Sequence, residues 1–244
     1  MYQKQRTSLS RTAALAALAI ATLAGACTDD GESLVILQNQ IPGDGCVVPP
    51  GADAEFRASG AVETRSSSGY LFTPVVESLL EKTDVNARTV TMRGADVDVT
   101  FPDGFFSGSE EADLRDRALT RFSQSFTGSL PAKATASFAF VVLPGELLAE
   151  VGDKLDSDEK VRAIVEVVVF GDLRGGEVES VPFTYPIDVC VDCLVTDRGE
   201  CSSLSSSFMA RQGNACNPHQ DDKVDCCTID GEEVCPAVGT AAPG

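Results

Sequence analysis

Two cysteines separated by two residues, Cys190 and Cys193, have the spacing used by zinc sites and by redox-active dithiols. A redox pair is typically held at a helix N-terminus in a βαβ unit, and a zinc site requires a second well-spaced pair or histidines. The surrounding sequence offers neither context. We therefore expect a structural disulfide here, with redox chemistry and metal binding as the alternatives.

His219, the only histidine, lies in a polar stretch between cysteines. The sequence contains no G-x-S-x-G nucleophile elbow, no H-E-x-x-H motif and no glycine-rich phosphate loop followed by lysine. It thus predicts no catalytic residue, no metal ligand and no cofactor. Two acidic clusters could bind Ca²⁺ through their carboxylate oxygens, which is the alternative to two solvated loops. The spacing of their acids is not specific for Ca²⁺, and the first cluster lacks the glycine and the terminal glutamate of an EF-hand loop. Solvated loops are therefore favoured. The clusters are Asp153, Asp156, Asp158 and Glu159, and Asp221, Asp222 and Asp225.

The first 26 residues carry three basic side chains and then an apolar run rich in alanine and leucine. This order is typical of an export leader, and the run is shorter than the roughly 20 apolar residues of a membrane-spanning helix. Residues 23–27, Leu-Ala-Gly-Ala-Cys, resemble the lipobox of bacterial lipoproteins, in which the cysteine thiol receives diacylglycerol. We therefore predict removal of residues 1–26 and lipidation of Cys27. Cleavage at an ordinary A-x-A site, which releases a soluble protein, is the alternative.

The number of cysteines supports the lipid. The chain has nine, and if a lipid occupies Cys27, the remaining eight can pair completely in an oxidising compartment. The eight expected disulfide cysteines are Cys46, Cys190, Cys193, Cys201, Cys216, Cys226, Cys227 and Cys235.

The adjacent pair Cys226 and Cys227 is expected to bond to two different partners, because a bridge between sequence neighbours closes a strained ring. As a hypothesis, we place Cys46 with Cys190 or Cys193 at one end of the main domain. Six cysteines would then form three bridges near the C-terminus.

The charge of the chain argues against nucleic acid as a partner. The formal net charge is −18, and removal of the leader leaves 16 basic against 37 acidic residues, or −21. Such a surface repels phosphate groups, so we expect no nucleic-acid binding.

The composition and the short extended patterns predict a mainly β fold. Hydrophobic residues make up 43% of the chain, enough for a core, and alternation of apolar and polar residues is clearest around residues 95–101. We predict an Ig-like antiparallel β-sandwich of about eight strands, with residues 161–170 central to a sheet, followed by a small disulfide-rich C-terminal module. Two helices are expected at residues 110–117, capped by Ser109, and around residues 147–155. The other candidate strands are residues 34–37, 70–80, 87–92, 118–126, 136–142 and 178–187.

The expected domain organisation follows these changes in composition. It comprises a lipoprotein signal peptide at 1–26, a lipid-anchored tether at 27–33, a β-sandwich domain at 34–189, a Cys-rich disulfide module at 190–236 and a disordered tail at 237–244.

Several segments resemble predicted outer-membrane lipoproteins of myxobacteria and their relatives. These segments are residues 69–76 (GYLFTPVV), 94–97 (GADV), 183–194 (FTYPIDVCVDCL), 216–221 (CNPHQD) and the pair Cys226-Cys227. The resemblance covers most of the chain after the leader. It implies a β-sandwich with a Cys-rich end and a lipid anchor, and it implies no activity.

The expected function follows by elimination. We expect a cell-envelope lipoprotein, held to the outer membrane by its N-terminal lipid, with a non-enzymatic structural or protein-binding role and an envelope protein as its partner. The alternative is an envelope hydrolase that uses two carboxylates as general acid and base.

Overall fold

The computed structural model describes residues 33–66, 68–82, 88–205 and 207–235. The predicted leader, Cys27, most of the tether and the C-terminal tail lie outside these residues. Within them no helix has the length and apolar character needed to span a membrane.

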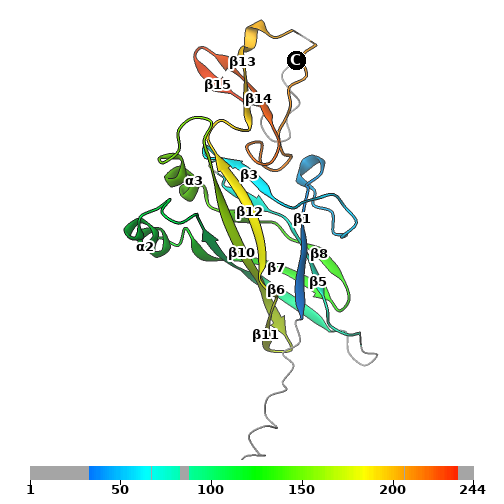
Figure 1. Ribbon diagram of the computed structural model, residues 1–244. Helices are drawn as coiled ribbons and strands as arrows, with labels where there is room; N and C mark the ends of the chain where they lie inside the picture. The colour runs from blue at the N-terminus through cyan, green and yellow to red at the C-terminus, as the bar shows by residue number, and fades with distance from the viewer. Residues whose placement is uncertain (1–32, 67, 83–87, 206, 236–244) are drawn as a thin grey trace, which may run out of the picture. The chain divides into compact units, whose positions relative to one another are not determined.

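The larger sheet forms one layer of the fold, in the order β3-β12-β10-β6-β7, with β11 paired to β10 (Figure 1). Its pairs are antiparallel except β12 with β3, which run parallel. The bounds are β3 (Gly60–Glu63), β6 (Thr89–Thr100), β7 (Arg121–Pro131), β10 (Lys160–Leu173), β11 (Gly176–Glu179) and β12 (Phe183–Cys190).

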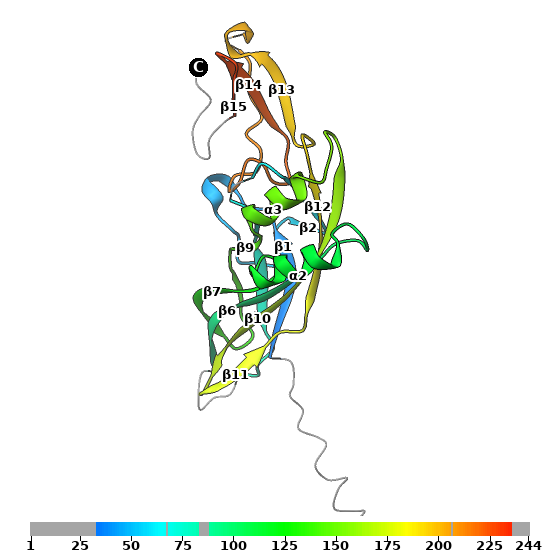
Figure 2. The same cartoon turned by 90° about the vertical axis from the view of Figure 1, so that its left-hand side faces the viewer.

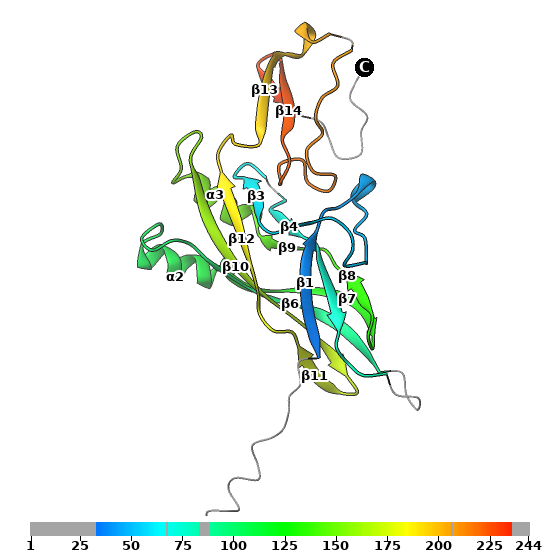
Figure 3. The same cartoon turned by 45° about the vertical axis from the view of Figure 1, so that its right-hand side comes forward.

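The second layer faces this sheet across the core, as Figure 3 shows. It consists of a sheet in the order β2-β1-β5-β8 and a pair, β4 with β9, that lies next to β5 and β8 along the chain. Buried side chains of both layers, such as Ile36 on β1 and Val165 on β10, belong to one apolar cluster. The bounds are β1 (Leu34–Gln40), β2 (Phe56–Arg57), β4 (Tyr70–Phe72), β5 (Pro74–Ser78), β8 (Thr135–Ser137) and β9 (Phe140–Leu143).

The predicted mainly β sandwich is confirmed, and β10 is central to its sheet as expected. Burial alternates along this strand: Val165 and Val167 are buried, whereas Glu166 between them is exposed. A nearly continuous apolar run is therefore compatible with one solvated face, since Ile164 stays 37% exposed.

The predicted number of strands was too low, because several expected strands are divided. Residues 70–80 form β4 and β5, which separate at Thr73, and residues 136–142 contribute to β8 and β9. The Thr73 side chain and its N–H bond to Asn39 on β1, which breaks the ladder at that point. Alternation of side chains continues through such a break, so the sequence pattern does not reveal it.

Two helices connect strands on one side of the sandwich, as Figure 2 shows, at α2 (Gly108–Asp116) and α3 (Gly145–Gly152). The predicted cap of α2 was wrong. Ser107 caps it, because its Oγ accepts from the Glu110 N–H while the Glu110 carboxylate accepts from the Ser107 N–H, a capping box. The α3 helix buries Leu147, Leu148 and Val151, as the helical spacing predicts.

The C-terminal part contains a three-stranded sheet. The sheet runs β13 (Val195–Glu200), β14 (Val224–Ile229) and β15 (Glu232–Val234), with β13 and β14 parallel. Two single turns of 3-10 helix complete the elements, at η1 (Asp44–Cys46) and η2 (Cys201–Ser203).

Candidate functional site: a buried polar junction

All eight cysteines of the described residues are paired, in four disulfides. Cys226 bonds to Cys235 and Cys227 to Cys201, so the adjacent cysteines have separate partners as predicted. The hypothesis for Cys46 was wrong. It bonds to Cys216, with Cα atoms 4.7 Å apart, while the other three bridges lie between Cys190 and the C-terminal end.

The reason for this pairing lies in residues 214–222, which we call the docking loop. This loop returns to the sandwich and lies against β3 and β4, which brings Cys216 to η1. Cys190 and Cys193 instead close on each other across Asp192, whose φ of +58° turns the chain sharply. The spacing of cysteines in the sequence contains no information about this return of the loop.

Side-chain amides of the docking loop imitate a neighbouring strand. Gln220 accepts from the Leu71 N–H and donates to the Leu71 carbonyl, both at 2.8 Å. Asn217 donates to the Gly69 carbonyl at 2.7 Å and to Ser66 Oγ at 3.1 Å. Both amide side chains are buried, so these bonds satisfy backbone groups of β4 that have no strand on that side.

Beneath the loop lies a cluster of buried polar side chains, centred on two tyrosines. The Tyr70 and Tyr185 hydroxyls are 3.2 Å apart, and Asn39 donates to both, at 3.3 and 2.9 Å. Tyr70 also donates to the Asp221 carboxylate of the docking loop at 3.2 Å. Together with Arg57, whose Nε lies 3.7 Å from Asp221, these residues form what we call the polar junction.

Burial sets the protonation of the junction. It raises the pKa of Tyr70 well above its usual value, with the Asp221 carboxylate adding to the effect, so the phenol stays neutral. Burial also raises the pKa of Asp221, although the Ala61 N–H and Arg57 oppose this. Neither group lines the hollow between α2 and α3 or the hollow on the outer face of the larger sheet. The junction is thus suited to holding the docking loop in place.

A second buried carboxylate lies next to the junction, at Glu63 on β3. It is fully buried, and its two oxygens accept the N–H groups of Asp192 at 2.9 Å, of Leu194 and of Val195 at 3.2 Å. The turn that contains the Cys190–Cys193 disulfide is therefore wrapped around one carboxylate. The cysteine sulfurs lie near the Glu63 oxygens, but both are in the disulfide and offer no thiolate for metal or redox chemistry in this state.

The second acidic cluster predicted from the sequence does not converge on one point. Asp222 bonds to Arg57 at 2.6 Å, while Asp221 faces Tyr70. Asp225 accepts from Arg211 and Arg198. In the first cluster, Glu159 accepts from the Asp156 N–H. His219 is half-buried, and burial, with Arg65 nearby, lowers its pKa, which favours the neutral ring.

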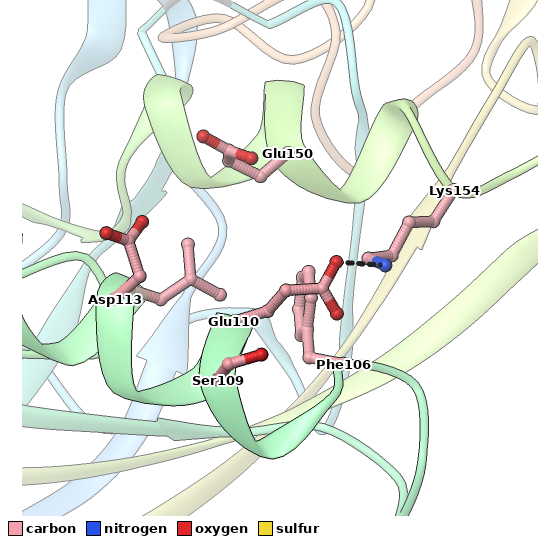
Figure 4. Close-up of a pocket in the computed structure, with 7 residues that line it drawn as sticks. Phe106, Ser109, Glu110, Asp113, Glu150 and Lys154 are labelled. Carbon is pink, nitrogen blue, oxygen red and sulfur yellow. Dashed lines mark hydrogen bonds and ion pairs between the residues drawn. The ribbon is translucent and has the colours of Figure 1, made fainter.

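Acidic side chains also line two hollows of the described residues: Asp96, Asp98 and Glu166 line one on the outer face of the larger sheet, and the other lies between α2 and α3 (Figure 4). The hollow between the helices measures about 210 Å³, and Glu110 within it bonds to Lys154 at 2.8 Å. Hydrogen bonds from Lys154 and Ser107 lower the pKa of Glu110 to about 2, so this carboxylate stays ionised and is unsuited to act as a general acid. Glu150 across the hollow bonds to Arg117.

No family model matches the chain, and none of the curated proteins compared with it is significantly similar. The junction nevertheless connects the segments on which the sequence resemblance rests. Residues 69–76 contribute Tyr70, residues 183–194 contribute Tyr185, and residues 216–221 contribute Gln220 and Asp221. Asn39, Arg57 and Glu63 were not predicted, because each lies at or near the end of its strand, where polar residues are usual and give no signal of burial.

Asp225 gives a prediction about pH. The Asp225 carboxylate accepts hydrogen bonds from the side chain and the backbone N–H of Arg211 and from the side chain of Arg198. These bonds lower the pKa of Asp225 to about 2, against about 3.9 in an unfolded chain. Its contribution to stability is therefore complete above about pH 4 and is lost as the pH falls toward 2. We expect Asp225→Asn to lower stability at pH 7 and to flatten its decline below pH 4, measured by urea unfolding at several pH values. Asp153→Asn, at an exposed site, is the control, and an unchanged pH profile in Asp225→Asn would contradict the assignment.

Proposed function

We propose that this protein is an exported, lipid-anchored protein of the cell envelope, with a non-enzymatic structural or protein-binding role. The observation that carries the proposal is the complete pairing of the eight described cysteines into four disulfides. Disulfides persist in oxidising compartments, so this pairing supports export. It also leaves Cys27, the ninth cysteine, without a partner among them, as expected of a thiol that carries a lipid.

The non-enzymatic role is supported by the way buried carboxylates are used. Glu63 and Asp225 are the buried acids of the described residues, and the side chain of Asp221 is 3% exposed. Each of the three is bonded to backbone N–H groups or arginines. None of them lines the hollow between the helices or the hollow on the outer face of the larger sheet. A hydrolase with a carboxylate pair requires two acids that face an open cleft and are free to transfer protons. Asp96 and Asp98 do line the hollow of the larger sheet, but Asp96 accepts from Ser123 and Asp98 is paired with Arg121.

The anchor is tested by expressing the full chain in a bacterium that processes lipoproteins and supplying labelled palmitate. We expect the protein to take up label and to sediment with membranes. Cys27→Ser should lose the label and leave the membrane fraction, because the hydroxyl is not a substrate for thiol acylation. Thr22→Ser, a change in the same leader that preserves the small residues before Cys27, should behave as the unchanged protein. Equal labelling of Cys27→Ser would refute the proposal.

A further inference from the structure

The last strand of the larger sheet, β7, has an open edge. It is 11 residues long and pairs with β6 on one side, and no strand of the described residues pairs with its other side. The opposite edge of the same sheet is different. There β3 has four residues, and the docking loop closes it through a bridge between Val62 and Gln220. An unpaired edge strand offers a row of free N–H and C=O groups to another strand.

The hydrogen bonds to β6 show which backbone groups of β7 point outward. The Val99 N–H donates to the Thr120 carbonyl, and the Ala132 N–H donates to the Arg88 carbonyl. Backbone direction alternates along the regular parts of an antiparallel strand, so even-numbered residues of β7 face β6 and odd-numbered residues face away from it on either side of a register shift. At that shift residues 126 and 127 of β7 lie opposite the single residue between Met92 and Gly94 of β6, outside the regular alternation. The outward residues of the regular parts are Arg121, Ser123, Ser125 and Ser129, and all four are exposed, as is Thr127 at the register shift.

The charge around this edge differs from that of the rest of the protein. Residues 117–145 form the longest acid-free run after the leader, and they contain β7, β8 and β9 with two arginines and one lysine. The nearest acids on β6, Asp96 and Asp98, are bonded to Ser123 and Arg121 of β7 itself. In a chain with 37 acidic residues, this edge is a place where two copies can approach without strong repulsion.

We infer that β7 binds β7 of a second copy, antiparallel and edge to edge, so that two larger sheets become continuous. The two-fold axis of such a pair is perpendicular to the sheet, and the small hydroxyl side chains of β7 leave room for the partner strand. The inference rests on the proposed binding role only in that it names a second copy of this chain as the binding partner.

The test measures particle mass over concentration. The processed protein is purified from the membrane or soluble fraction, whichever contains it, and is followed by sedimentation from about 5 to about 200 μM, a range suited to a small interface. We expect a monomer–dimer equilibrium that shifts toward dimer as salt rises, because salt screens the net repulsion between acidic copies. Monomer alone at every concentration and salt level would overturn the inference.

Ser125→Pro and Ser125→Ala locate the contact. Proline has no backbone N–H, so Ser125→Pro removes the outward N–H of residue 125 and leaves the hydrogen bonds between β7 and β6 in place. Alanine keeps this N–H and serves as the control. We expect dimerisation to weaken about tenfold or more in Ser125→Pro relative to Ser125→Ala, at unchanged circular dichroism. If the proline variant does not fold, Thr127→Asp adds an acid to each edge and should likewise weaken dimerisation, most clearly at low salt. A dimer that tolerates the folded variants has its interface elsewhere, which contradicts the inference.

A photo-crosslinking residue at position 127 supplies the direct readout. In a mixture of isotopically light and heavy copies, we expect crosslinked peptides that join residues 118–131 of one copy to the same segment of the other. Crosslinks from this position to another part of the chain would contradict pairing of β7 with β7. The result is independent of the palmitate experiment, because an unlipidated protein can dimerise through the same edge.

Discussion

Replacing Cys46 and Cys216 together by alanine should lower the free energy of unfolding by about 3–5 kcal/mol, the largest effect expected of any change described above. These cysteines are separated by 170 residues, so their bridge restricts most of the unfolded chain and fixes the docking loop to η1. The measurement is urea unfolding followed by circular dichroism. Limited proteolysis should also show earlier cleavage in residues 214–222.

The matched control is the double variant Cys190→Ala with Cys193→Ala. This bridge spans a sequence separation of three, so it restricts the entropy of the unfolded chain only slightly, and its removal is expected to cost about 2 kcal/mol. The turn also retains its three hydrogen bonds to Glu63. A larger loss from the 190–193 pair than from the 46–216 pair would show that the long bridge does not determine the position of the docking loop.

The second large effect is expected at Glu63. Glu63→Ala removes the acceptor of three backbone N–H groups, those of Asp192, Leu194 and Val195, and leaves them poorly satisfied at a buried position. An unsatisfied buried polar group costs about 1–3 kcal/mol, and some of these groups will gain water, so we expect a loss of about 2–4 kcal/mol. Hydrogen exchange of these amides should accelerate at the same time.

Glu179→Ala is the control for Glu63, because Glu179 on β11 is an exposed strand glutamate whose side chain makes no hydrogen bond or ion pair with the described residues. Its loss should stay within about 0.5 kcal/mol of zero. Equal stability of the two variants would mean that the carboxylate of Glu63 does not hold the turn.

The sequence predicted the sandwich because the period of two along the strands survives in the structure. Residues 95–101 alternate between core and solvent as expected, and residues 161–170 form most of the central strand. Strand breaks were missed for a physical reason. At Thr73 the strand changes its partner without changing the face on which each side chain lies. The alternation of apolar and polar residues shows which face of the sheet each side chain lies on, but it does not show which strand is the neighbour.

The polar junction was beyond prediction because its members come from distant parts of the chain. Asn39 and Tyr185 are 146 residues apart, and Tyr70 and Asp221 are 151 apart. A single polar residue in a strand reads as a solvated position unless its partner is known. The docking loop was in turn assigned to the cysteine-rich end by composition, although its side chains bond to β3 and β4.

These features give the proposed binding role a structural basis. The docking loop, the long disulfide and Glu63 fix one end of the larger sheet, where β3 is covered. The other edge of that sheet, at β7, is open and free of acids. A sheet closed at one edge and open at the other is suited to adding a strand at one defined place.

Intact-mass spectrometry of the protein from native-like membranes, with alkylation under denaturing conditions but without reductant, tests the central claim most directly. The account predicts a chain that begins at Cys27, carries the mass of its acyl groups and takes up no alkylating reagent, because eight cysteines are paired and the ninth is acylated. A chain with an unmodified N-terminal cysteine, or one that takes up reagent at several of the eight positions, would contradict it.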